Sequence, residues 1–171
     1  MSARALCTDF IASGRILGQD LESGPDDWDF ALGGSSWPLV DVQKRQMRRD
    51  YGLVEVSFEL TDSEWVCTVI HLQAHRLNIG SDLSALVPPG VVDEYSPIEP
   101  VVEFSDVAHE LAAAGVDVER ILDRSTRDYR RFWVARSESV VHVQGDARDK
   151  PGAVWSVGRA LGGAVWKKPQ C

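Results

Sequence analysis

Two neighbouring runs of strand-forming residues, separated by a short polar segment, constrain the fold of this chain more than any other feature. Residues 53–60 alternate between apolar and polar, so every second side chain from Val54 onward lies on the same apolar face. The segment TDSE at 61–64 is polar and suits a turn. Residues 65–72 are apolar on both faces and rich in β-branched types, which is typical of a central strand. The sequence therefore predicts an antiparallel hairpin inside a sheet.

The register of this hairpin follows from keeping its apolar side chains together, because a slip of one residue would exchange the two faces. The preferred register gives these cross-strand pairs: Leu60 with Val66, Phe58 with Thr68, Val56 with Ile70 and Val54 with Leu72. On the opposite face, the same register places Glu55 across from His71.

Two helices are indicated by their capping residues. Ser2 can cap a helix that ends at Gly14, and Ser105 can cap one that ends at Gly115. Residues 117–129 fit helical spacing, and the arginines at 120, 124, 127 and 131 would share one stripe with acidic residues interleaved, which favours an ion-paired surface helix. The basic run at 44–49 is interpreted as the end of a helical turn, and the proline-rich segment 78–100 as a long irregular connection.

Three further strands are predicted near the end of the chain, at residues 131–136, 139–144 and 153–157. Together with the hairpin and the helices, they predict one α+β domain over residues 1–171. We expect an antiparallel sheet of about five strands, with helices packed on one face.

The amino-acid composition argues against several classes of function. The 171 residues carry a net charge of −8, which argues against a general binder of nucleic acid or anionic membranes. No apolar run is long enough to span a membrane, and the first residues lack the apolar core of a signal peptide. Three cysteines without metal-ligand spacing indicate reduced thiols and a cytoplasmic protein.

The charge is most one-sided between residues 20 and 41, which include six acidic residues and no basic one. One interpretation is a solvated acidic loop. The other is a docking surface for a basic protein, in which aromatic side chains serve as anchors. The predicted contact residues are Asp26, Asp27, Trp28, Asp29 and Trp37, and the segment 88–95 is the second choice.

An alternative ligand site lies on the polar face of the predicted hairpin, where Glu55, His71, Gln73 and His75 would line a groove. On one strand the two histidine rings would be separated by roughly 13 Å, too far to share a metal ion. No serine or cysteine motif of a known nucleophile is present, and no spacing singles out an acid–base couple. The sequence thus predicts no metal and no cofactor, and it leaves open a catalytic site assembled from residues far apart in the chain.

The segments RRDYGLVEVSF (48–58) and WVCTVIHLQAHRL (65–77) resemble the core of a set of short actinobacterial proteins of uncharacterised function. These proteins look like immunity proteins, the cytosolic partners that neutralise polymorphic toxins. The predicted architecture is also similar to that of SMI1/KNR4-type immunity domains. The resemblance implies a non-enzymatic binding protein.

Two hypotheses result. The first is an immunity protein that binds a basic toxin or effector through its acidic surface, without nucleic acid or membrane partners. The second is a small enzyme or ligand-binding domain that uses the polar face of the sheet. The partner's identity and the oligomeric state stay open.

Overall fold

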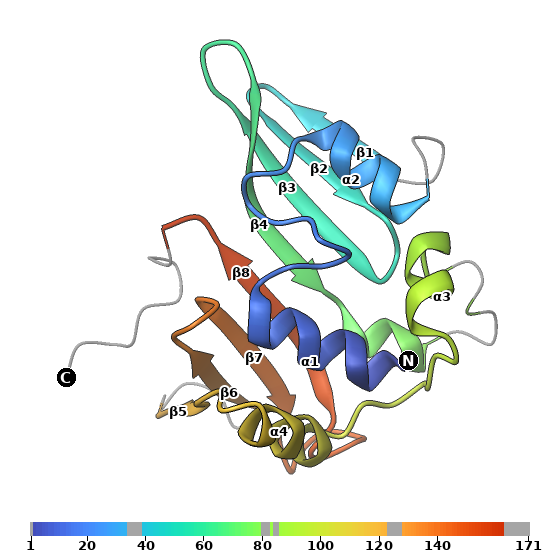
Figure 1. The fold of residues 1–171 in the computed structure, drawn as a ribbon, viewed down its shortest axis with the longest axis vertical. Helices are drawn as coiled ribbons and strands as arrows, with labels where there is room; N and C mark the ends of the chain where they lie inside the picture. The colour runs from blue at the N-terminus through green and yellow to red at the C-terminus, as the bar shows by residue number, and fades with distance from the viewer. Residues whose placement is uncertain (1, 34–38, 80–82, 84–85, 123–127, 163–171) are drawn as a thin grey trace.

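The computed structural model describes residues 2–33, 39–79, 83, 86–122 and 128–162, and shows one antiparallel sheet with helices on one side (Figure 1). The elements are α1 Ala3–Ser13, α2 Pro25–Leu32, β1 Leu39–Gln43, β2 Gln46–Asp50, β3 Val54–Leu60, β4 Trp65–Leu72, η1 Ala74–Asn78, α3 Pro89–Tyr95, α4 Phe104–Ala113, β5 Glu119–Ile121, β6 Tyr129–Val134, β7 Ser139–Gln144 and β8 Val154–Ala160. The predicted α+β class is confirmed. The sheet has eight strands in the described residues, however, where about five were expected.

The strand order is β1-β2-β3-β4-β8-β7-β6-β5, so the first four strands and the last four form two meanders that meet at β4 and β8. Four residue pairs join the meanders, from Val69 opposite Ala160 to Leu72 opposite Val157. Helices α3 and α4 lie in the chain between the two meanders, and they cover the same side of the sheet as α1 (Figure 1).

The predicted hairpin is β3–β4, and half of its register is confirmed. Val54 lies opposite Leu72 and Glu55 opposite His71. Beyond Ser57 the register shifts, so that Phe58 pairs with Cys67 and Leu60 with Trp65. The cause is a bulge: Thr68 has no partner in the register, and its hydroxyl donates a hydrogen bond to the Ser57 carbonyl at 3.2 Å.

The other capped or alternating segments are also confirmed. Ser2 caps α1, where its Oγ accepts a hydrogen bond from the Ala5 amide at 3.2 Å, and Gly14 ends the helix in the left-handed region. The second predicted helix is α4, but it begins at Phe104 with Glu103 at its N-cap and no side-chain cap, so the predicted cap at Ser105 is wrong. The three late strands are β6, β7 and β8. Residues 139–144 form β7 with the predicted bounds.

Three strands were missed. The basic run at 44–49, interpreted as helical, is instead the turn of the β1–β2 hairpin and most of β2. In β2 only Met47 is buried, which leaves too little apolar alternation to recognise a strand. The predicted helix at 117–129 is wrong where β5 pairs with β6, and its residues 123–127 lie outside the described part of the chain. Segments expected to be irregular contain α2 and α3.

The hydrophobic core lies between the sheet and the helices. Phe10 and Ile11 of α1, Trp28 and Leu32 of α2, and Val107 and Leu111 of α4 are fully buried, as are Val56, Ile70 and Val157 on the facing side of the sheet. None of the helices α1 to α4 covers the opposite face of the sheet (Figure 1). We call it the open face.

None of the helices in the described segments has both the length and the apolar composition that crossing a membrane requires.

Candidate functional site

The predicted acidic contact residues do not share one environment. Asp26 and Asp27 are exposed in the first turn of α2, and the Asp27 carboxylate accepts a hydrogen bond from the Gly24 amide at 2.9 Å. Trp28 is 0% exposed and Asp29 is 7% exposed, because both face the sheet. Trp37 lies outside the described residues. Of the four described residues in this set, Asp26 and Asp27 are therefore the two placed to meet a partner.

Asp29 has a structural role instead. Its carboxylate pairs with the Arg49 guanidinium and accepts a hydrogen bond from the Tyr51 hydroxyl at 2.6 Å. Arg49 also donates a hydrogen bond to the Pro25 carbonyl at 2.9 Å, so the Arg49 side chain links β2 to the first residue of α2. Burial alone lowers the pKa of Arg49, but hydrogen bonds with Asp29 and Tyr51 raise it above its ordinary value. Arg49 thus keeps its positive charge beside Asp29 inside the protein.

The helix side carries nearly all of the excess charge. The two segments that contain the helices α1 to α4, residues 2–33 and 86–116, hold twelve acidic and two basic residues. The described segments that contain the strands, 39–79, 117–122 and 128–162, hold twelve of each. The helices lie on one side of the sheet (Figure 1), so among the described residues the helix-bearing segments bring a strong excess of negative charge to that side, while the strand-bearing segments are balanced.

Two of the alternative ligand-site residues, Glu55 and His71, form the predicted cross-strand pair on the open face. Glu55 lies opposite His71, but the Arg76 guanidinium approaches Glu55 at 3.3 Å and Asp50 at 2.6 Å. Arg48 lies 3.9 Å from the second oxygen of Glu55. The Glu55 carboxylate is therefore part of an ion-pair network. Burial lowers the pKa of His71, while the charge of Glu55 acts in the opposite direction.

His75 and Gln73 are placed differently from the prediction. The strand ends at Leu72, and His75 lies in the short helix η1, which begins after Gln73. The His75 ring stacks on Trp155 with centroids 4.0 Å apart, and its Nδ1 lies 3.2 Å from the Trp155 carbonyl oxygen. Burial lowers the pKa of His75. The ring is thus packed against β8, and the four predicted residues do not line one groove.

Sequence reasoning missed a histidine on the same face. His142 lies opposite Ser156, whose Oγ is 3.4 Å from Nδ1 of the ring. Burial, followed by the charges of Arg131 and His71, lowers the pKa of His142 to about 4. Alternation with Val141 and Val143 indicated the face of His142. Nothing local indicated that β8 would bring β7 next to β4.

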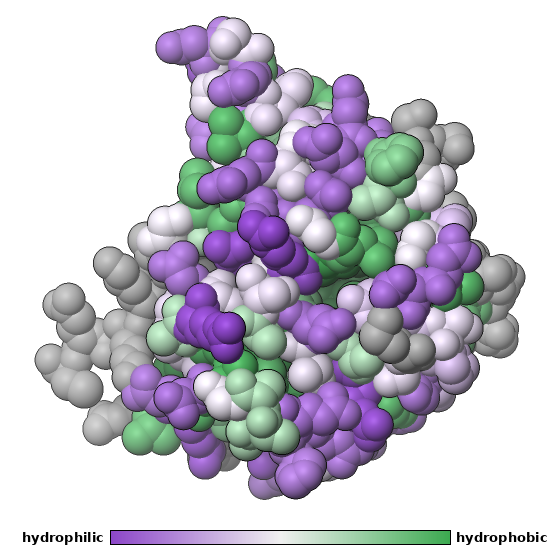
Figure 2. All heavy atoms as spheres, in the orientation of Figure 1, coloured by the Kyte–Doolittle hydropathy of each residue, from purple (hydrophilic) through white to green (hydrophobic). Residues whose placement is uncertain are grey.

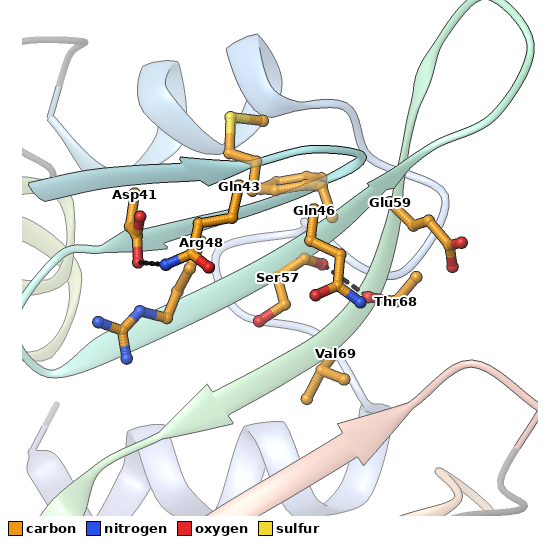
Figure 3. Close-up of a pocket in the computed structure, with 10 residues that line it drawn as sticks. Asp41, Gln43, Gln46, Arg48, Ser57, Glu59, Thr68 and Val69 are labelled. Atoms are coloured by element: carbon orange, nitrogen blue, oxygen red, sulfur yellow. Dashed lines mark hydrogen bonds between the residues drawn. The ribbon is translucent and has the colours of Figure 1, made fainter.

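A depression of about 500 Å³ does lie on the open face, over β1 to β4 (Figure 3). Its polar lining consists of Asp41, Gln43, Gln46, Arg48, Ser57, Glu59 and Thr68. Gln43 Nε2 donates to Asp41 at 3.5 Å, while the side chains of Arg48 and Glu59 extend toward opposite sides of the depression (Figure 3). None of the predicted ligand-site residues belongs to this lining. Within the described ranges, no group of three or more His, Cys, Asp or Glu side chains is arranged to hold a metal ion.

Comparisons with known proteins add no relative: no protein-family model, no curated protein and no solved structure matches this chain.

Proposed function

We propose that this chain is a non-enzymatic binding protein of the immunity type, which neutralises a basic toxin or effector by contact with its acidic helix side. The observation that supports this function is the separation of charge, with twelve acidic and two basic residues in the helix-bearing segments. A field of one sign over one side of a protein steers an oppositely charged partner and accelerates association.

The contact surface in this proposal is centred on α2 and α3. Asp26 and Asp27 on α2 and Asp93 and Glu94 on α3 are exposed, and the two helices contact each other. Phe30, which is 89% exposed on α2, supplies an aromatic anchor of the kind that dominates protein interfaces. The resemblance to immunity proteins agrees with this role.

The test compares two triple variants that remove the same charge from different sides. Glu22→Gln/Asp26→Asn/Asp93→Asn neutralises exposed positions on the helix side, and Asp62→Asn/Glu64→Gln/Asp146→Asn neutralises exposed positions in turns between strands. Each protein is immobilised, incubated with native cytosol at low and high salt, and the captured protein is identified and its affinity measured.

We expect a basic partner whose affinity for the wild type falls at least about tenfold between 50 and 500 mM salt. The helix-side variant should bind about tenfold more weakly and the turn variant within about twofold of wild type, since exposed charges contribute up to about 1 kcal/mol each. Equal losses in the two variants, or affinity that does not respond to salt, would contradict the proposal. Co-expression then shows whether the partner is toxic and whether the wild type restores growth.

Ligand binding on the open face is the second candidate function, because the polar depression of Figure 3 lies there. A small molecule that shifts the amide resonances of Ser57 and Thr68, and leaves those of α2 unchanged, would favour this candidate.

A further inference from the structure

A groove of about 560 Å³ opens on the helix side, between α1, the loop that follows it and α3. Ala12, Leu17 and Tyr95 contribute apolar surface to its lining, and Asp9 and Glu94 contribute carboxylates. Figure 2, which views this side, shows the molecular surface hollowed between these elements. The groove therefore combines apolar walls with negative charge in a concave site.

The carboxylate of Asp9 is held in place without being neutralised. The Tyr95 hydroxyl donates a hydrogen bond to Asp9 Oδ2 at 3.0 Å. Burial, and then the hydrogen bond to Asp9, raise the pKa of Tyr95, so the phenol stays an uncharged donor at neutral pH. Tyr95 thus orients Asp9 and leaves its negative charge in the groove.

Among the described residues of the lining, the one base is Arg15, and it is already engaged. Arg15 pairs with Asp20 at 2.8 Å, and Asp20 is not on the groove lining. Within the described parts of the chain, no arginine or lysine pairs with Asp9 or Glu94. The groove consequently offers two carboxylates that form no ion pair with a basic side chain of the described residues.

We propose that this groove receives a lysine or arginine side chain of a basic protein partner. Such a side chain has an aliphatic stem that packs on apolar surface and a charged end that needs acceptors. The stem would lie on Ala12, Leu17 and the Tyr95 ring, and the cation would meet Asp9 and Glu94 in charge-assisted hydrogen bonds. An anionic group is repelled here, and an apolar one leaves both carboxylates unpaired. This inference rests on the proposed function and names the chemistry of one of its contacts.

The experiment uses the full ¹⁵N-labelled chain and three blocked tripeptides, acetyl-Gly-X-Gly-amide, in which X is arginine, lysine or norleucine. Norleucine has the aliphatic stem without the cation. We expect amide shifts centred on residues 9–18 and 94–95 with millimolar affinity for arginine and lysine, and none for norleucine. A dissociation constant of 1 mM corresponds to about −4 kcal/mol, which suits one charged side chain.

The decisive variant is Asp9→Asn/Glu94→Gln, which keeps the shape of the groove and removes its charge. We expect it to weaken peptide binding at least fivefold. Asp62→Asn/Glu64→Gln removes the same charge from exposed positions in the β3–β4 turn, outside the groove lining and outside the proposed contact surface, and should leave the affinity unchanged. Amide spectra of both variants verify that they fold. Shifts located elsewhere, equal binding of norleucine, or undiminished binding by Asp9→Asn/Glu94→Gln would overturn the inference.

Failure of this inference and failure of the proposed function give different results. If a basic partner is captured in a salt-sensitive way but binds the Asp9→Asn/Glu94→Gln variant as tightly as wild type, the groove assignment fails and the function stands. If the peptides bind in the groove but no partner responds to the helix-side charges, the function fails and the groove remains a cation-binding site.

Discussion

At the scale of residues, burial decides what each acidic side chain does. Asp26 and Asp29 lie three positions apart on α2, and both belonged to the predicted contact surface. Asp26 is exposed, whereas Asp29 accepts hydrogen bonds from Arg49 and Tyr51 inside the protein. A carboxylate in that position stabilises the fold only while its partners are present, because removing one member leaves a buried charge uncompensated.

Replacing Asp29 with alanine should therefore destabilise the protein strongly. We expect the free energy of unfolding to fall by about 3–5 kcal/mol, since Arg49 would lose its counter-charge in a site that is mostly shielded from water. Urea denaturation followed by circular dichroism measures the change. Asp26→Asn on the same helix is the control and should cost less than about 1 kcal/mol. A loss below 1 kcal/mol for Asp29→Ala would show that the network contributes little to stability.

At the scale of elements, α2 and α3 approach each other closely through a glycine. A Cβ atom on Gly90 would lie 2.0 Å from the Ala31 carbonyl oxygen of α2 and 3.2 Å from Leu17 Cδ1. A steric clash with backbone atoms at that distance cannot be relieved by rotating a side chain, so the two helices would have to separate. Because α3 forms one wall of the proposed groove, this contact also sets the shape of the groove.

The substitution Gly90→Ala should separate α3 from α2 and lower the free energy of unfolding by about 2–3 kcal/mol. The amide resonances of residues 15–18 and 94–95 should shift at the same time, since the groove changes shape. Val92→Ala, on the more exposed side of α3, is the comparison and should change stability by about 0.5–1 kcal/mol. Equal stability of Gly90→Ala and wild type would mean that the helices are not packed this closely in solution.

At the scale of the whole molecule, two meanders behave as one sheet only if the β4–β8 pairing holds. Those strands occupy the centre of the sheet and share four residue pairs, whereas β1 and β5 form its edges. Central strands covered by helices open mainly by global unfolding, and edge strands open locally. The β4–β8 pairing therefore predicts that the two meanders unfold cooperatively, and this can be measured at each backbone amide.

Hydrogen exchange should give the highest protection in β4 and β8, with free energies of opening close to that of global unfolding. Amides in β1 and β5 should exchange with opening free energies at least about 2 kcal/mol lower. The measurement is native-state exchange by NMR in low concentrations of denaturant. If β4 and β8 exchanged much faster than β3 and β7, the two meanders would open as separate units.

Local pattern alone determined a substantial part of this fold. The hairpin β3–β4, the pairing of Glu55 with His71, the capped helix α1 and the bounds of β7 could all be read from the sequence. In each case the information is contained in residues a few positions apart: an alternation, a capping residue or a polar turn. The net negative charge could be read in the same way.

Only the tertiary structure decided the rest. Strands β2 and β5 carry little apolar pattern and are strands because a neighbour pairs with them. Trp28 and Asp29 are buried because α2 packs on the sheet, and the acidic segments form one side because α1, α3 and α4 lie on that side too. The β4–β8 pairing joins residues more than 80 positions apart. Burial and charge distribution depend on which distant surfaces meet, and no local pattern of residues records that.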